Sequence, residues 1–281
     1  MQRYHINHPK LVLLLLVLIA TFTLASIVTA ESDEKPVSGT REEVATELEM
    51  AKRIYLDYYK DSMNLDRSIE ILEGILEKDP DNVEALIFLS RVWLTYGYAK
   101  APNDKEKLRV FNNGIKAAKK AIELAPDNPD AHFFYAANLG SWGEARGVLK
   151  SLFLLPEIKR ELKLILKLDP NHVYALGMNG LLYYTIPDFM GGDLHISEIY
   201  LRRAIRLDPH LTVLKIYLAK NLIKQKRYNE AKEVLKEVIE EKTPTIYPDW
   251  YFNRETAKNL IAEIEKESQR TPLPNLVIPK W

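Results

Sequence analysis

The fold of this chain is decided by a segment near its carboxyl end, residues 207–240, which reads LDPHLTVLKIYLAKNLIKQKRYNEAKEVLKEVIE. Apolar residues recur at three- and four-residue steps on both sides of the polar KQKR, a pattern that predicts two amphipathic helices joined by a short turn. The proline at its start ends any preceding helix. The predicted packing positions of the pair are Leu218, Ala219, Leu222, Tyr228, Ala231, Leu235 and Val238.

The proline segment occurs three more times upstream. Residues 76–82 read LEKDPDN, residues 124–128 read LAPDN, and residues 168–172 read LDPNH. The four prolines, Pro80, Pro126, Pro170 and Pro209, are therefore spaced by 46, 44 and 39 residues. A helical unit repeated at such a period predicts a solenoid, in which each unit packs only on its neighbours.

Small residues also recur at fixed places within each unit. Ser90, Ala136 and Gly180 stand at one position of the first helix. With the Asn-Glu-Ala sequence at residues 229–231, this spacing resembles the tetratricopeptide repeat (TPR) family over about residues 43–240. The resemblance implies an all-α fold over residues 41–268: a TPR-type α-solenoid, that is, a right-handed superhelix of antiparallel helix pairs, with a C-terminal capping helix over about residues 249–267.

The units are longer than the 34 residues of the family repeat. The alignment places the extra residues between the two helices of a unit, at residues 98–107, 143–153 and 186–190, all on one edge of the solenoid. Insertions at such turns often mark a binding face, so we expect this edge to be functional, with neutral insertion as the alternative. The residues predicted for this edge are Trp142, Phe189, Gly191, Gly192 and Asp193, of which Asp193 is also expected to cap a helix.

The two ends of the chain differ from the repeats. Residues 1–30 contain Arg3 and Lys10 and then an apolar run over residues 11–30. This pattern predicts a cleaved signal peptide or, alternatively, an uncleaved membrane anchor. We therefore expect export to the periplasm or cell envelope, with membrane contact only through this segment. Residues 31–40 are expected to be a linker, and the Pro-rich apolar tail, residues 269–281, is expected to pack on the body or on a partner.

Composition limits the chemistry of the protein. The chain has 39 basic and 39 acidic residues, which provides no electrostatic footprint for nucleic acid, and it has no cysteine for disulfides or thiol catalysis. No histidine pair has zinc-site spacing, and the glycines at 191–192 lack the rest of a phosphate loop. The sequence therefore predicts no enzyme, no metal site and no cofactor.

In the TPR family the first helix of each unit lines the concave side. Relatives that clamp a carboxylate use Lys, Asn and Arg at positions held here by Ile87, Phe133, Gly177 and Ile216, so we do not expect such a clamp. An apolar groove suits a small amphipathic ligand or one face of a helical peptide. The alternative is that the same residues are core. The lining positions implied by the resemblance are Ile87, Arg91, Leu94, Phe133, Ala137, Tyr174, Leu181, Tyr184, Ile216, Lys220 and Ile223.

A narrower resemblance rests on residues 186–193, IPDFMGGD, followed by YLRRA at residues 200–204. Together with the export signal and the long repeats, they resemble the TPR component associated with tripartite ATP-independent periplasmic (TRAP) transporters. Those family members are lipoproteins, whereas this chain lacks the cysteine. Two functions are thus expected as alternatives. One is an exported scaffold that binds protein partners through the groove, and the other is a TRAP-associated component that binds a small apolar solute beside a periplasmic solute receptor.

Overall fold

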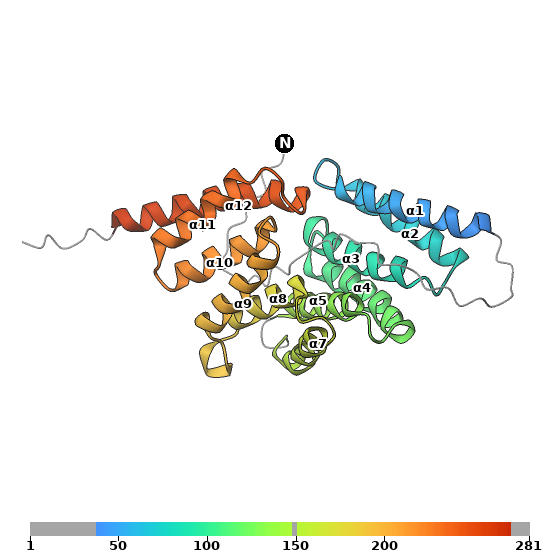
Figure 1. Cartoon of the computed structure of the whole chain (residues 1–281), viewed down its shortest axis with the longest axis horizontal. Helices are drawn as coiled ribbons and strands as arrows, with labels where there is room; N and C mark the ends of the chain where they lie inside the picture. Colours follow the sequence, from blue (N-terminus) through green and yellow to red (C-terminus); the bar gives the residue numbers. More distant parts are fainter. Residues whose placement is uncertain (1–37, 148–150, 271–281) are drawn as a thin grey trace, which may run out of the picture.

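The computed structural model describes residues 38–147 and 151–270, and these residues form helices arranged in antiparallel pairs around an arc (Figure 1). The predicted all-α TPR solenoid is confirmed, and no strand occurs in the described ranges. The helices are α1 Ser38–Leu56, α2 Met63–Lys78, α3 Val83–Ala99, α4 Asp104–Leu124, α5 Pro129–Arg146, α7 Leu155–Leu168, α8 Val173–Thr185, α9 Leu194–Leu207, α10 Thr212–Lys224, α11 Tyr228–Glu240 and α12 Tyr247–Arg270, with short 3₁₀ turns η1 Leu152–Leu154 and η2 Asp188–Met190.

Among these helices, none combines the length and the apolar character that a bilayer span requires. The predicted signal or anchor, residues 1–30, lies outside the described residues. So do residues 31–37 of the predicted linker and residues 271–281 of the predicted tail.

The proline segments work as combined helix stops and caps. Two residues after Pro80, the side chain of Asn82 accepts a hydrogen bond from the backbone N–H of Ala85 at 3.0 Å. Asn128 and His172 stand two residues after their prolines and cap α5 and α8 in the same way. A side-chain acceptor at this position satisfies N–H groups that the first helical turn leaves unpaired. The fourth segment differs, because Leu211 has no side-chain acceptor for α10.

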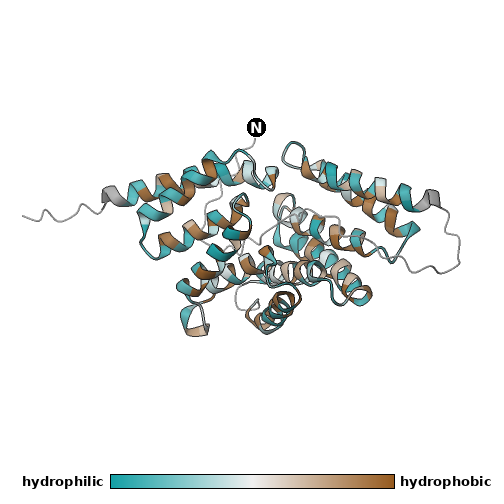
Figure 2. Cartoon of the chain, viewed as in Figure 1, coloured by the Kyte–Doolittle hydropathy of each residue, from teal (hydrophilic) through white to brown (hydrophobic). Residues whose placement is uncertain are grey.

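Apolar side chains fill the space between paired helices, and polar side chains cover the outward surfaces (Figure 2). Small residues set the closeness of this packing. A Cβ atom at Gly180 of α8 would lie 2.6 Å from the Cγ of Leu201 of α9, so only glycine permits the observed approach. The predicted small positions Ser90 and Ala136 are also fully buried.

The extra residues are accommodated in two different ways. Between α5 and α7, and between α8 and α9, they form longer connections that contain η1 and η2, as expected. In the α3–α4 unit only residues 100–103 separate the helices, and the surplus lengthens the helices to 17 and 21 residues, against 13 each for α10 and α11. The expected loop at residues 98–107 is therefore mostly helix.

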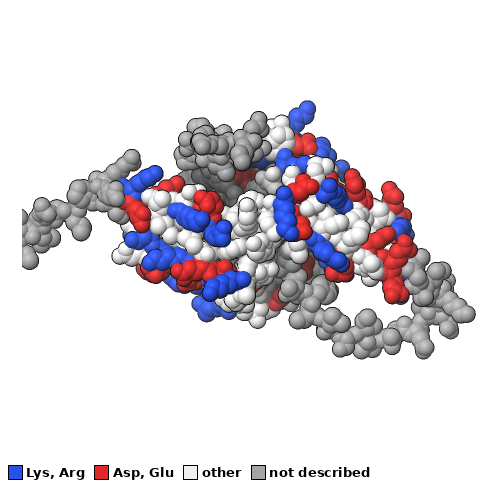
Figure 3. Space-filling model, turned by 90° about the horizontal axis from the view of Figure 1, so that it is seen from above, with Lys and Arg blue, Asp and Glu red and all other residues white. Residues whose placement is uncertain are grey.

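The capping helix α12 packs on α10 and α11, and its first turns also touch the other end of the array. The ring of Tyr58, in the α1–α2 connection, stacks on Phe252 with centroids 6.0 Å apart. The centre of the Tyr59 ring lies 5.3 Å from the centre of the Tyr247 ring and 5.2 Å from that of the Tyr251 ring. Figure 1 shows these two ends next to each other on the open side of the arc, and Figure 3 shows acidic and basic residues intermixed on that side. We call this contact the seam; it consists of Tyr58, Tyr59, Tyr247, Asp249, Tyr251 and Phe252.

Candidate binding site on the inner helices and the turn edge

The predicted groove residues lie on α3, α5, α8 and α10, the inner helices of the arc. Most are buried, and we call this surface the inner wall. Ile87, Tyr184, Lys220 and Ile223 are half-buried. The buried apolar members belong to the hydrophobic core, and the role of these residues in binding stays a prediction. The residues no more than 6% exposed are Arg91, Leu94, Phe133, Ala137, Tyr174, Leu181 and Ile216.

Arg91 is the polar centre of the inner wall. Its Nε donates a hydrogen bond to the hydroxyl of Tyr55 at 3.3 Å, and its guanidinium lies over the Tyr55 ring at 5.0 Å and the Phe88 ring at 5.7 Å. Its Nη2 is buried and has no hydrogen-bond partner among the described residues. Leaving a buried charged donor unpaired is unfavourable by about 1–3 kcal/mol or more. The position is therefore suited to a ligand oxygen.

A second polar point lies on α10. The hydroxyl of Tyr217 is buried without a hydrogen-bond partner in the described part of the chain, and burial raises its pKa well above the usual value. The Nζ of Lys220 lies 5.5 Å from the centre of the Tyr217 ring, and burial lowers the pKa of this amine. Tyr217 escaped the sequence prediction because its spacing is that of an ordinary core residue.

Asp249 brings a carboxyl group into the seam. The hydroxyl of Tyr58 donates a hydrogen bond to its Oδ1 at 3.4 Å. Burial raises the pKa of Asp249 to about 7, although the positive charge of Arg91 and the Tyr58 hydrogen bond oppose this rise. No pattern in the sequence distinguishes this residue from any other acidic residue in the first turn of a helix.

The turn edge contains the second predicted set. The side chain of Asp193 accepts hydrogen bonds from the backbone N–H groups of His195 at 2.8 Å and Ile196 at 3.0 Å, which confirms the predicted cap. Phe189 is 89% exposed, and Phe153, which the site prediction omitted, is 85% exposed. Trp142 is half-buried, with the guanidinium of Arg146 4.6 Å above its ring. Exposed aromatic rings thus mark two successive connections on this edge.

Gly191 and Gly192 shape the α8–α9 connection for different reasons. Gly191 has φ +92°, a backbone conformation that favours glycine, whereas a Cβ atom on Gly192 would overlap the backbone carbonyl of Ile186.

We expect Gly192→Ala to lower the free energy of unfolding by about 2 kcal/mol or more, because backbone atoms must move to make room. Gly74→Ala is the matched control. Its Cβ would meet nothing within 4 Å, and alanine in a helix interior should be neutral or stabilise by about 0.5–1 kcal/mol. Urea unfolding of both variants measures the difference, and equal stabilities would contradict the steric argument.

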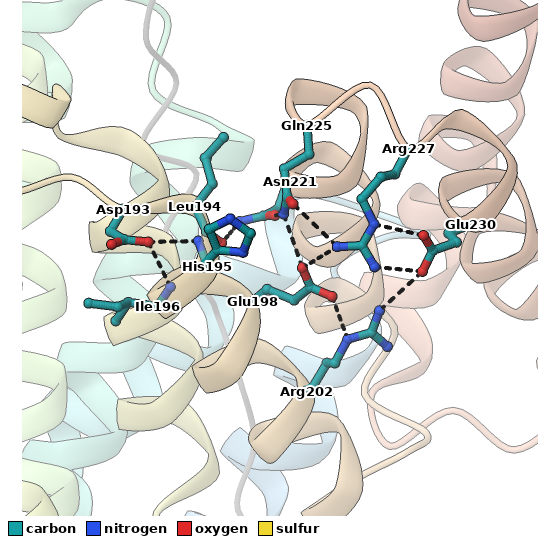
Figure 4. Close-up of polar contacts among 10 residues, drawn as sticks. All are labelled: Asp193, Leu194, His195, Ile196, Glu198, Arg202, Asn221, Gln225, Arg227 and Glu230. Carbon is teal, nitrogen blue, oxygen red and sulfur yellow. Dashed lines mark hydrogen bonds and ion pairs between the residues drawn. The ribbon is translucent and has the colours of Figure 1, made fainter.

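A charged network fixes the same edge to the next unit (Figure 4). Glu198 of α9 accepts hydrogen bonds from Arg202 at 2.7 Å, Gln225 at 3.0 Å and Arg227 at 2.5 Å, and Glu230 also bonds Arg227. Burial alone would raise the pKa of Glu198, but the three hydrogen bonds outweigh it and lower the pKa to about 2. The network joins the α8–α9 unit to the α10–α11 connection.

The inner wall and the turn edge are distinct surfaces, formed respectively by the inner helices and by the intra-unit connections. Neither supplies a metal site: within residues 38–147 and 151–270, no three His, Asp or Glu side chains are grouped to hold an ion. His132, for example, is engaged by Glu161 at 2.7 Å and the backbone oxygen of Pro126 at 2.8 Å.

Comparison with known proteins identifies the family to which part of this chain is similar. A family profile for "Regulator of microtubule dynamics protein 1-3" matches residues 48–189, half of the chain, and a tetratricopeptide repeat profile matches residues 218–243. Human regulator of microtubule dynamics protein 2 is 30% identical over 121 residues, covering 42% of this chain and 29% of that protein. The bovine protein 1 is 21% identical over 182 residues, covering 59% and 55%. The chain thus spans about a third to about half of these relatives.

A solved structure, that of a thermophilic TPR protein of Thermus thermophilus, superposes with a TM-score of 0.59 at 17% identity, covering 77% of this chain and 99% of that one. TPR proteins typically bind protein partners, so the fold indicates a protein-interaction scaffold. The resemblance to the TRAP-associated component finds no support in these matches. The chain belongs to the regulator of microtubule dynamics protein 1–3 family and has the TPR fold.

Proposed function

We propose that this protein is a scaffold that encloses an apolar segment of a protein partner, such as one face of a helix, against the inner wall. The observation that carries the proposal is the buried Nη2 of Arg91, which has no hydrogen-bond partner among the described residues. A backbone carbonyl or carboxylate of the partner would satisfy this donor. Phe133, Tyr174 and Leu181 of the inner wall, which are buried in this structure, would provide apolar contact once the array opens.

Entry of the partner requires the ends of the array to separate. The seam is made by side chains of the α1–α2 connection and of the first turns of α12. Its hydrogen bond between Tyr58 and Asp249 is long, at 3.4 Å. Regions held by few contacts open at a lower free energy than the global core. We infer that the seam holds the two ends of the array together and opens to admit the partner to the inner wall.

A chemical lock tests this function. Because the chain has no cysteine, Tyr59→Cys combined with Tyr251→Cys gives one defined site for a short bismaleimide cross-linker. We expect the untreated double variant to retain a protein partner in a native pull-down and the cross-linked form to lose most of it. The single variant Tyr251→Cys, treated with the same reagent, should retain the partner.

Equal capture by the locked and unlocked forms would contradict binding at the inner wall. Recovery of no protein by the unlocked form would contradict the scaffold itself.

A small amphipathic molecule is the second candidate occupant. The observation in its favour is that the inner helices α3 and α10 each carry a buried polar atom without a hydrogen-bond partner among the described residues, on Arg91 and on Tyr217. Native mass spectrometry of the purified protein distinguishes the two candidates, because a retained small molecule adds a discrete mass of small size. Genes for a solute receptor and a permease beside this one would favour the TRAP-associated alternative.

The cellular compartment that the repeats face determines which protein partners they can meet. We propose that residues 1–30 direct export or anchor the chain, so that the repeats face the periplasm or cell envelope. The name of the matched relatives concerns microtubules, which makes tubulin the partner to test if the repeats instead face the cytosol. N-terminal sequencing and fractionation of the mature protein distinguish these cases. We assign no catalytic step and no cofactor to either function.

A further inference from the structure

The outer face of the arc carries a cluster of basic side chains that neither the inner wall nor the turn edge uses. They lie on α4, α7 and α9, which follow one another along the outer rim in Figure 1. We call this set the basic ladder; its members, all exposed, are Lys116, Lys119, Lys163, Lys167, Arg203 and Arg206.

The repeat itself builds the ladder. Lys119 and Lys163 each stand seven residues before the proline that closes their unit, and Lys167 and Arg206 each stand three residues before theirs. In α4 the second of these positions is the exposed Glu123, which is the acidic exception within the ladder. Equivalent positions of successive units are neighbours along a solenoid. Charges dispersed along the sequence are therefore collected on one face.

Few of these charges are neutralised within the protein. Lys163, Lys167 and Arg206 form no ion pair with any residue that the structure describes, and neither does Lys116. The Nζ of Lys119 lies only over the Tyr135 ring, at 5.5 Å. By contrast, intramolecular ion pairs engage other basic residues of the same helices, namely Lys120, Arg160 and Arg202.

Acidic residues bound the ladder on both sides. On α2, Glu73 and Glu77 occupy the same seven- and three-residue positions before Pro80, and α11 exposes Glu233, Glu237 and Glu240. A long polyanion would extend over these carboxylates and be repelled. The face is also convex, so a flat bilayer would touch only its crest. A short, flexible acidic peptide can follow the curve and stop before the flanks.

We propose that the basic ladder binds a short acidic segment of a partner protein. This surface is separate from the inner wall, so the inference goes beyond the proposed function. The outer helices α4, α7 and α9 pack through the inner helices α5 and α8 rather than directly on one another. Each step between outer helices is therefore longer than the roughly 8–10 Å between packed helices. An extended segment of more than about six residues, at about 3.3 Å per residue, is needed to cover two such steps.

A fluorescein-labelled peptide of alternating Glu and Gly residues is the probe, followed by fluorescence anisotropy. We expect saturable binding at about 20 mM salt that is largely lost at about 500 mM, because exposed charges are screened beyond the Debye length. Lys163→Gln combined with Lys167→Gln should weaken binding by about tenfold, since two exposed charge pairs together contribute about 1–1.5 kcal/mol. The matched control is Lys258→Gln combined with Lys266→Gln on α12, which makes the same change of charge outside the ladder.

The proposal that the peptide binds at the basic ladder is supported if the α7 variant loses affinity for the peptide and the control variant keeps it. The circular dichroism spectra of both variants should match that of the wild type. Equal loss in both variants would show that only net charge matters, and absence of saturable binding by the wild type would also overturn the proposal.

Sedimentation with phosphatidylserine vesicles is the second measurement. If vesicles bind and the α7 variant releases them, the surface is a membrane site rather than a peptide site. A bismaleimide-locked seam should leave peptide binding unchanged, which separates this surface from the inner wall.

Discussion

Asp249→Asn should make the protein more stable at pH 8 and remove most of the pH dependence of its stability between about pH 4 and pH 7. Burial raises the folded-state pKa of this carboxyl from 3.8 to about 7. In that window the folded protein holds a proton that the unfolded chain has released. The free energy of unfolding therefore falls as pH rises through the window and levels off above pH 7.

The expected size of this effect is large. A difference of about three pKa units corresponds to about 4 kcal/mol, which is an upper limit because the seam can open locally before the whole chain unfolds. Asparagine keeps the shape and can still accept the hydrogen bond from Tyr58, but it has no charge to bury. Urea unfolding at pH 5 and pH 8 measures the change.

Asp188→Asn, at an exposed position in η2, is the control and should change stability by less than about 0.5 kcal/mol at either pH. The argument for a buried carboxyl in the seam would be wrong if Asp249→Asn behaved like this control.

Glu198→Gln should have the opposite pH signature. The folded-state pKa of Glu198 is lowered from 4.5 to about 2, so between these values the unfolded chain binds the extra proton. The contribution of Glu198 is therefore complete above about pH 4.5 and is lost as pH falls toward 2. We expect Glu198→Gln to lower the free energy of unfolding at pH 7 by about 1–3 kcal/mol. A shift of about 2.5 pKa units sets the upper end of this range, and solvent screening around the partly exposed Arg202 and Arg227 reduces the effect.

The difference between wild type and Glu198→Gln should shrink at pH 3, where protonation already weakens the wild-type network. Glu233→Gln serves as the control, because Glu233 is exposed and, among the described residues, forms an ion pair with Lys236 alone, one helical turn away. Such a pair contributes about 0.5 kcal/mol or less. A constant difference between pH 3 and pH 7 would show that Glu198 acts through packing rather than through its charge.

Local features were predictable because their causes lie within a few residues. The prolines end helices, and Asn82 and Asn128 cap the next ones, since capping bonds join residues two or three positions apart. Asp193 was predicted as a cap for the same reason. The buried small positions, such as Gly180, followed from the repeat, in which the same contact is made in each unit.

Other features depend on residues far apart in the chain. Tyr58 and Asp249 meet across 191 positions, and Phe252 reaches the same ring, so neither sequence segment reveals the seam alone. The extra residues of the α3–α4 unit could be counted but not assigned to helix or loop, because tertiary packing decides whether a helix continues. The inner wall was predicted to be apolar, but the sequence left open whether its residues line an open groove or form core, because an apolar helical stripe is compatible with both.

The sequence by itself determined that this chain is a solenoid of helix pairs, because hydrophobic periodicity, proline stops and caps act over one or two helical turns. Only the tertiary structure decided that the two ends of the array meet, which inner-wall residues are enclosed, and that basic residues of three units face outward together. Those outcomes depend on the curvature accumulated over successive units, and curvature is a sum of small packing angles that no single segment contains.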